Sequence, residues 1–307
     1  MFNLLFKILG NSKKLSILIY HQVLPEFDPM RPYEMYAEVF EQQLKWLQEN
    51  FVLLTLKQAV EMLEQNRLPK NAAVITFDDG YENNASVALP ILKKHDVVAT
   101  FFIASDFLNG GTMWNDIVIE FVRNWPTEKL ILEEFPEEYY PTSNINEKYS
   151  SAEKILLKLK YLPFQERTRI IQRLKPLASP KGLMMSDTQV IELHTSGMEI
   201  GGHTCSHPIL AKLDESNARQ QISENKHYLE SLLKQPLFSF AYPNGKPQHD
   251  YLPRDVNLVK ELGYACAVST ANGVSTRNTD RYQLLRFSPW KRDKFGFLTL
   301  LAKNYFY

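Results

Sequence analysis

The sequence predicts an α/β fold built on a parallel sheet or barrel, and three features indicate it. Short apolar runs alternate with amphipathic helical stretches along most of the chain, which is the pattern of repeated βα units. Chemically active side chains directly follow several of the runs, as expected of loops at the carboxyl ends of parallel strands. The 307 residues fit one large domain, because α/β barrels reach about 250 residues as a single unit.

The alternation starts at residue 15 and stops near residue 104. Apolar runs predict strands, and apolar residues spaced by three or four predict helices. We expect strands at 15–20, 51–56, 72–77 and 97–104, with helices at 36–51, 56–65 and 83–95 between them.

The alternation resumes near residue 186. Ser186 and Gln189 are spaced as a capping box, and Gly197 ends the helix that they begin. We expect helices at 186–197, 214–235 and 255–263, and strands at 198–202, 237–242, 264–269 and 282–287.

The segment from about residue 110 to 185 does not follow this alternation of strands and helices. It contains several prolines, an acidic patch and two helical runs at 150–162 and 164–177, with few strand signals. Its apolar residues are too few and too irregular to indicate an independent core. We therefore predict a single domain over residues 1–307 with a mostly helical insertion at about 110–185.

Composition excludes several classes of protein. The apolar fraction of 44% and the charged fraction of 23% are those of a globular protein. The 35 basic and 35 acidic side chains cancel, so the net charge does not suggest a nucleic-acid partner. Two cysteines, Cys205 and Cys266, are too few for a disulfide framework and slightly favour a reducing compartment.

The N-terminal stretch "MFNLLFKILGNSKK" bears on localisation. It lacks the basic start and the small-residue cleavage site of a secretory signal, so we expect a cytoplasmic protein. Phe2, Leu5, Phe6 and Leu9 share one helical face, and the alternative to an ordinary first helix is a surface anchor on the inner face of the membrane. The sequence does not indicate an oligomeric state.

Residue types with catalytic uses stand directly after the predicted strands. His21 follows the first strand, Asp78 and Asp79 follow the strand at 72–77, His203 follows the strand at 198–202, and Tyr242 ends the strand at 237–242. Because the carboxyl ends of parallel strands meet at one mouth, we expect these residues to lie close together.

Asp79, His203 and His207 form a candidate metal site. One carboxylate and two imidazoles leave positions open for water, which is typical of a catalytic divalent metal. "HTCSH" spaces the two histidines by four residues, and Pro208 after it indicates a tight turn. Cys205 could be a further ligand or a small packed thiol. Taken alone, adjacent aspartates more often form a solvated turn, and most histidine pairs of this spacing bind no metal.

The combination of motifs is more specific than its parts. "TFDDG" together with "HTCSHP" resembles the first two motifs of the NodB-homology polysaccharide deacetylases, carbohydrate esterase family four, and both match at every defined position. The resemblance extends to "YHQVLP", "TFFI" and "FAYPNG" and covers most of the chain outside the insertion.

The resemblance implies a fold, an activity and a role for each motif residue. It implies a distorted (β/α)7 barrel and hydrolytic N-deacetylation of an N-acetylated sugar, in a cell-surface polysaccharide or its precursor, with release of acetate. Asp79, His203 and His207 would hold a divalent metal, usually zinc. Asp78 would be the general base, and the backbone N–H of Tyr242 would stabilise the oxyanion.

Two motifs depart from the family's commonest pattern. "FSFAYPNG" has no Arg before its Pro, and "LLRFSP" offers Arg286 where most members have a catalytic histidine. "YHQVLP" resembles the branch of poly-N-acetylglucosamine deacetylases in which a histidine at the first strand is the acid. We therefore expect His21 to be the general acid and Arg286 to orient the charge of Asp78.

Two other functions stay open at this point. One is a catalytically inactive carbohydrate-binding member of the same fold, and the other is an esterase or amidase on a different acyl substrate. Trp114, Tyr242 and Trp290 could stack against sugar rings or simply pack in the protein. The sequence names neither the sugar, nor its chain length, nor the native metal.

Overall fold

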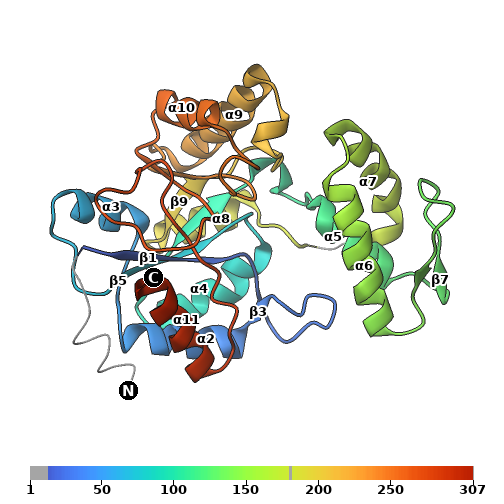
Figure 1. The fold of residues 1–307 in the computed structure, drawn as a ribbon, viewed down its shortest axis with the longest axis horizontal. Coiled ribbons are helices and arrows are strands. Elements are labelled where there is room, and N and C mark those ends of the chain that lie inside the picture. Colours follow the sequence, from blue (N-terminus) through green and yellow to red (C-terminus); the bar gives the residue numbers. More distant parts are fainter. Residues whose placement is uncertain (1–12, 180–181, 307) are drawn as a thin grey trace.

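A curved sheet of seven parallel strands forms the centre of the computed structural model, which describes residues 13–179 and 182–306 (Figure 1). The strands are β1 (Leu15–Tyr20), β4 (Val52–Leu54), β5 (Ala72–Phe77), β6 (Thr100–Ile103), β9 (Glu199–Gly202), β10 (Ser239–Ala241) and β11 (Cys266–Val268). Their order is β1, β5, β6, β9, β10, β11, and β4 pairs with the first half of β5. The predicted N-terminal arm lies outside the described residues.

The segment around Leu284 and Phe287 closes the sheet into a barrel. Leu284 forms a parallel bridge with Val268 of β11, and Phe287 forms one with Leu18 of β1. The prediction of a regular strand at 282–287 is wrong, because the N–H of Arg286 donates to the carbonyl of Ala271 instead of to a neighbouring strand. The predicted barrel itself is confirmed, and its last position is filled by an irregular segment.

Helices cover the outside of the sheet (Figure 1). They are α2 (Ala37–Gln48), α3 (Leu56–Glu64), α4 (Leu89–Lys94), α8 (Asp187–Thr195), α9 (Glu215–Leu233), α10 (Pro253–Glu261) and α11 (Lys294–Phe306). The predicted capping box of Ser186 and Gln189 begins α8. No helix in the described part of the chain is both long enough and apolar enough to cross a bilayer.

Successive strand residues face two different cores, as the period of two in a strand requires. On β1, Ile17 belongs to the apolar cluster inside the barrel, whereas Leu18 belongs to the cluster under the outer helices. On β5, Val74 belongs to the cluster inside the barrel and Ile75 to the cluster under the outer helices. Both faces of each strand are buried, which explains why the sequences of these strands are continuous apolar runs.

A π-helical turn interrupts the helix predicted at 83–95. The turn η1 (Asn84–Ala88) precedes α4, and Pro90 stands near the start of α4. Pro90 has no N–H to donate to the preceding turn, so the regular hydrogen-bond ladder breaks there. The wider turn buries the side chain of Asn84 beside the end of β1.

The segment between β6 and α8 forms a mostly helical unit at one side of the barrel (Figure 1). Its elements are α5 (Trp114–Arg123), β7 (Lys129–Leu130), β8 (Tyr140–Pro141), α6 (Ile145–Lys160) and α7 (Phe164–Ala178). They pack around an apolar cluster that includes Ile117, Phe121, Ile155, Ile170 and Leu174. The assignment of the whole chain as a single domain stays a prediction.

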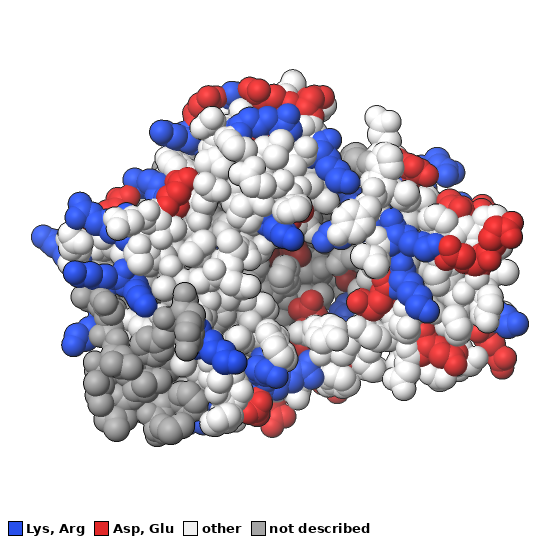
Figure 2. Space-filling view, in the orientation of Figure 1, with Lys and Arg blue, Asp and Glu red and all other residues white. Residues whose placement is uncertain are grey.

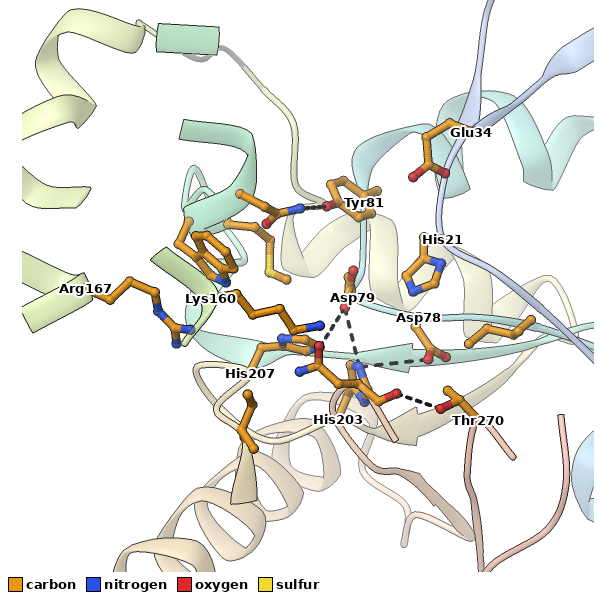
Figure 3. A pocket seen from close by; sticks show the side chains of 16 residues that line it. His21, Glu34, Asp78, Asp79, Tyr81, Lys160, Arg167, His203, His207 and Thr270 are labelled. Atoms are coloured by element: carbon orange, nitrogen blue, oxygen red, sulfur yellow. Dashed lines mark hydrogen bonds and ion pairs between the residues drawn. The ribbon is translucent and has the colours of Figure 1, made fainter. Parts of the chain in front are cut away.

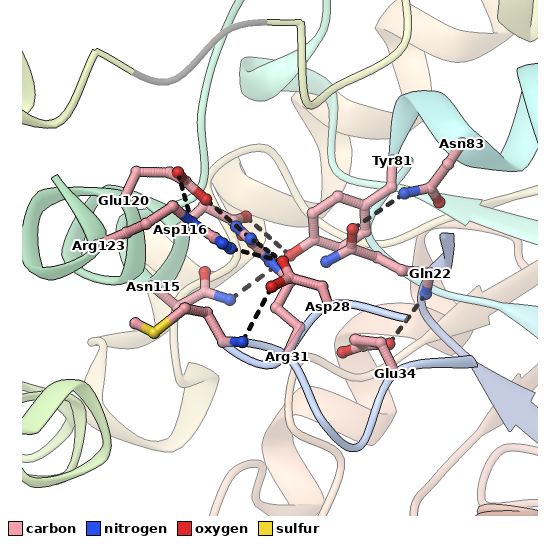
Figure 4. Close-up of polar contacts among 11 residues, drawn as sticks. Gln22, Asp28, Arg31, Glu34, Tyr81, Asn83, Asn115, Asp116, Glu120 and Arg123 are labelled. Carbon is pink, nitrogen blue, oxygen red and sulfur yellow. Dashed lines mark hydrogen bonds and ion pairs between the residues drawn. The ribbon is translucent and has the colours of Figure 1, made fainter. Parts of the chain in front are cut away.

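Buried charges tie this insertion to the barrel (Figure 4). Arg31 lies in the loop between β2 (Val23–Leu24) and β3 (Met35–Tyr36). Its guanidinium contacts Asp116 and Glu120 of α5, both at 2.8 Å. Tyr81, two residues after Asp79, donates its hydroxyl to Asp116 at 3.0 Å. The insertion is therefore anchored next to the predicted site, and the sequence analysis missed this network.

Candidate active site

A pocket of about 370 Å³ opens at the carboxyl ends of the strands, between the barrel and the insertion (Figure 3). Figure 2 shows this face hollowed between the two parts, with acidic and basic side chains near the hollow. The barrel contributes Ile19, His21, Glu34, Asp78, Asp79, Tyr81, His203, His207, Ile209, Asn244 and Thr270 to its walls, and the insertion contributes Met113, Trp114, Asn115, Lys160 and Arg167.

The predicted ligands Asp79, His203 and His207 meet in this pocket. Oδ1 of Asp79 lies 3.4 Å from Nε2 of His203 and 3.4 Å from Nε2 of His207. Asp79 has a φ of +79°, a left-handed conformation that aspartate tolerates better than most residues. This backbone turn directs Asp79 toward the histidines, away from the direction taken by Asp78 (Figure 3).

Helix α9 positions the loop that carries both histidines. Asn225 is completely buried; its amide oxygen accepts from the N–H of His203 at 3.1 Å, and its amide nitrogen donates to the carbonyl of Ile103 at 2.9 Å. Gln221 accepts from the N–H of Ser206 at 2.9 Å. These contacts join β6, β9 and α9 around the "HTCSH" loop, which is not helical.

The three side chains fit a divalent cation. Their ligand atoms all lie within 4.8 Å of one another. Oδ1 of Asp79 is buried and has no hydrogen-bond partner among the described residues, and 3.4 Å is too long for a good N–H···O bond. Nδ1 of His203 lies 2.7 Å from the carbonyl of Ala241, so it carries the proton and leaves the Nε2 lone pair available to a metal. Burial lowers the pKa of His207 to about 4, which keeps its imidazole neutral.

Cys205 does not join this cluster. Its thiol is buried, and burial raises its pKa to about 11. A thiol with such a pKa is protonated at neutral pH and is a poor ligand. Of the two alternatives, the structure therefore favours the packed thiol.

Arg286 and Asp78 form a buried bidentate pair beside the cluster of Asp79, His203 and His207. Nη1 and Nη2 of Arg286 lie 2.7 and 2.8 Å from the two oxygens of Asp78. Nε of Arg286 donates to the carbonyl of Ser269 at 2.9 Å, and Nη1 also contacts Thr76. Burial raises the pKa of Asp78, but Arg286 and His203 outweigh that effect and lower it. Asp78 is therefore ionised at neutral pH.

His21 faces the pocket between Glu34 and Asp78 (Figure 3). Its carbonyl accepts from the amide of Asn84 at 2.9 Å, which fixes the chain where β1 ends. The N–H of Gln22 lies 3.3 Å from the Glu34 carboxylate. Burial raises the pKa of Glu34, and His21 opposes that shift.

The role predicted for the backbone N–H of Tyr242, to stabilise the oxyanion, stays a prediction. In this structure the N–H of Tyr242 donates to the carbonyl of Val268 at 3.3 Å, as part of the pairing between β10 and β11. Its ring is buried and stacks on Tyr251 at 3.9 Å between centroids, and its hydroxyl donates to Tyr282. The sheet hydrogen bond and the packing of the ring therefore hold Tyr242 out of the pocket lining described above.

The sequence analysis missed the charged pocket residues Glu34, Lys160 and Arg167, and the polar ones Tyr81, Asn115, Asn244 and Thr270. Tyr81 follows "TFDDG" directly, so its position beside the site was available from the motif. Glu34 stands in a loop, and Lys160 and Arg167 stand at facing ends of two insertion helices. Local periodicity does not indicate where such residues come to lie.

Comparison with known proteins identifies the family. The sequence profile of the polysaccharide deacetylase family matches residues 65–126 and 141–267, more than half of the chain. The chain belongs to this family. The part of the insertion between residues 126 and 141 falls outside the match, and the matched segments contain Asp78, Asp79, His203 and His207.

Relatives of this polysaccharide deacetylase are found by sequence and by structure. A poly-beta-1,6-N-acetyl-D-glucosamine N-deacetylase of Staphylococcus aureus (strain MSSA476) is 27% identical over 258 residues, covering 84% of this chain and 68% of that protein. The Streptococcus pyogenes deacetylase PplD in complex with acetate has a TM-score of 0.61 at 20% identity and covers 91% of this chain and 93% of its own. IcaB from Ammonifex degensii has a TM-score of 0.61 at 18% identity, and the match covers 95% of this chain and 97% of IcaB. These likenesses confirm the predicted barrel fold.

Proposed function

We propose that this protein is a metal-dependent hydrolase that removes the acetyl group from an N-acetylated sugar of a surface polysaccharide or of its precursor. Water cleaves the amide C–N bond, acetate leaves, and the sugar keeps a free amine. One observation carries the proposal: Asp78, which is paired with Arg286, lines the same pocket as the cluster of Asp79, His203 and His207. The name of the Staphylococcus relative and the acetate in PplD support the same chemistry.

Asp79, His203 and His207 would hold the cation, and zinc suits a set of two imidazoles and one carboxylate. Such a cation polarises an amide carbonyl and lowers the pKa of a nearby water molecule to about 7. The protein's own part includes holding His203 in place, through Asn225 at its backbone and Ala241 at its ring.

Asp78 would accept the proton of the attacking water. The pKa of Asp78 is lowered, with Arg286 outweighing the effect of burial, so the carboxylate is available across the neutral range. Each of its oxygens has a second lone pair besides the one that accepts from Arg286. Arg286 thus fixes the direction of the carboxylate and does not remove its capacity to accept a proton.

His21 would donate the proton that the departing sugar amine needs. The residue lines the pocket, and the amide of Asn84 fixes its backbone. An imidazole is the side chain best suited to proton transfer near neutral pH. Glu34 lies beside it in the pocket wall (Figure 3), and an adjacent carboxylate favours the orientation of an imidazole that donates.

The proposal is tested by following both products from a panel of substrates. Zinc-loaded protein is incubated with N-acetylglucosamine oligomers, with O-acetylated esters and with unrelated amides, and acetate and free amine are quantified. Equal amounts of acetate and sugar amine from the oligomers support N-deacetylation. Acetate from the esters alone would instead assign an esterase, and zinc binding without release of acetate would indicate an inactive carbohydrate-binding protein.

A further inference from the structure

Two further hollows continue the active-site pocket along the boundary between the barrel and the insertion. The second hollow, of about 290 Å³, shares Lys160 and Ile209 with the pocket. The third, of about 430 Å³, shares Pro163, Pro208 and Leu213 with the second. Because each space has wall residues in common with the next, the three adjoin one another. They form one groove that leads away from the predicted metal ligands.

The two walls of this groove come from different parts of the chain. The insertion contributes the connection between α6 and α7, residues 161–163, and the barrel contributes the segment 208–213 and the first half of α9. Hydrogen bonds fix the barrel wall. The N–H of Ala211 donates to the carbonyl of Asp250 at 3.0 Å, and Arg254 donates to the carbonyl of Leu213. The barrel side of the groove is therefore a preformed part of the fold.

Tyr161 presents an aromatic ring to the second hollow. Although the residue lines this hollow, 63% of it is exposed. Nζ of Lys212, on the opposite wall, lies 5.7 Å from the centre of the ring, so the two walls come close together here. A tyrosine ring has apolar faces and a polar tip. A pyranose likewise has apolar C–H faces and hydroxyl groups at its edge, so the ring can stack on a sugar in the second hollow.

Neutral hydrogen-bonding side chains line the third hollow. They are Gln165, Ser206, Gln220 and Gln221, and no charged residue joins them among the described residues of its wall. Gln221 accepts from the N–H and the hydroxyl of Ser206, which leaves its amide N–H groups to donate. Gln220 donates to Glu224 at 2.8 Å, which leaves its amide oxygen to accept. Donors and acceptors of this kind suit the hydroxyl and acetamido groups of a sugar.

We infer that the substrate is a chain of several sugars, and that the groove binds the sugars next to the acetylated one. The nearer of them lie against Tyr161 and the farther ones beside Gln220. This inference rests on the proposed function of the pocket, and it narrows that function to the polymer. A precursor that carries a single sugar would leave both further hollows unfilled. Tyr161 and Gln220 thus determine a preference for long chains.

Turnover of oligomers of increasing length tests the inference. Zinc-loaded protein is given chitin oligomers, and oligomers with the beta-1,6 linkage named for the Staphylococcus relative, from the monosaccharide to the hexasaccharide. We expect kcat/KM to rise with length in at least one series, through a lower KM. Tyr161→Ala should lower kcat/KM for the longer oligomers about two- to tenfold and leave that of the monosaccharide unchanged.

Tyr139→Ala is the matched control for Tyr161→Ala. Tyr139 is also in the insertion, 61% of it is exposed, and Nζ of Lys129 lies 5.3 Å from the centre of its ring. It lines none of the three hollows, so the variant should keep the full dependence on chain length.

A blocking variant tests the farther part of the groove. Gln220→Trp places a bulky ring at the third hollow, so the longest oligomers should lose their advantage while the disaccharide keeps its own. Gln235→Trp, at an exposed position beyond the other end of α9, is the control and should leave the whole length series unchanged.

A binding measurement separates this inference from the proposed function. Calorimetry with the same oligomers on zinc-loaded Asp78→Asn protein reports affinity without turnover. Tighter binding of longer oligomers, weakened by Tyr161→Ala and unaffected by Tyr139→Ala, supports the inference even if no oligomer is deacetylated. Equal affinity for the monosaccharide and the hexasaccharide overturns it. A length dependence that Tyr161→Ala and Gln220→Trp both leave intact overturns it as well, because the chain then follows another path.

Discussion

Arg286 binds both carboxylate oxygens of Asp78, at 2.7 and 2.8 Å, although 208 residues separate them in the chain. Neither side chain is exposed to an appreciable extent. The pair joins the closing segment of the barrel to the loop after β5, and it holds one carboxylate ionised beside Asp79, His203 and His207.

Arg286→Met should impair both stability and activity. Removing one partner of a buried ion pair leaves a buried charge, at a cost of about 3–5 kcal/mol in the free energy of unfolding. Without Arg286, burial raises the pKa of Asp78, so the acidic limb of the pH–rate profile should move to higher pH. Urea unfolding and a pH series of acetate release measure the two effects. Arg277→Met, at an exposed position, is the control, and an unchanged profile in Arg286→Met would contradict the role of this arginine.

His21→Ala should lower kcat by about 10²–10⁴, the range typical of a lost general acid. The variant should still bind one metal ion, because His21 is not a member of the ligand cluster. Metal content is measured together with turnover to separate the two effects. Full turnover with metal bound would show that another group protonates the leaving amine.

Asn225→Ala should weaken metal binding without removing a ligand. The side chain bonds to the His203 backbone, to Ile103 and to Ser105. Loss of such a supporting contact should lower the metal affinity about 10–100-fold. A competition titration with a zinc chelator measures the affinity. Asn217→Ala, near the start of the same helix, should leave it unchanged, and equal affinities in the two variants would exclude a positioning role for Asn225.

Glu41 predicts a pH dependence of stability away from the site. Hydrogen bonds from Lys94 and His95 lower its pKa from 4.5 to about 2. Because the pKa in the folded state is the lower one, the contribution of Glu41 is present above about pH 4.5 and is lost as the pH falls toward 2. The difference in unfolding free energy between wild type and Glu41→Gln should therefore shrink between these values. Glu38→Gln, on the exposed side of α2, should show no such trend, and a difference for Glu41→Gln that stays constant with pH would refute the assignment.

Local sequence patterns predicted the barrel and the ligand cluster well. The runs at 15–20 and 72–77 are strands at those residues, because a strand buried on both faces is apolar throughout. Asp79, His203 and His207 come together because each follows such a strand or the loop after it. Strand order brings these ends to one mouth, which makes this part of the site predictable.

Other parts could not be predicted because they depend on contacts between distant segments. The Arg31–Asp116 pair joins a loop to an insertion helix, and neither residue carries a motif. Lys160 and Arg167 reach the pocket only through the packing of α5, α6 and α7. The strand expected at 282–287 fails for a related reason, since the N–H of Arg286 bonds to a neighbouring loop. Localisation in the cytoplasm stays a prediction.

We propose that N-deacetylation requires a cation held by Asp79, His203 and His207. The most direct test of this requirement is a titration of metal-free protein with zinc while acetate release from an N-acetylglucosamine oligomer is followed. Activity should rise from zero and reach a plateau at one zinc per chain, and Asp79→Asn should show neither the tight binding nor the activity. Acetate release at the same rate before and after removal of the metal would show that the reaction does not need the cation.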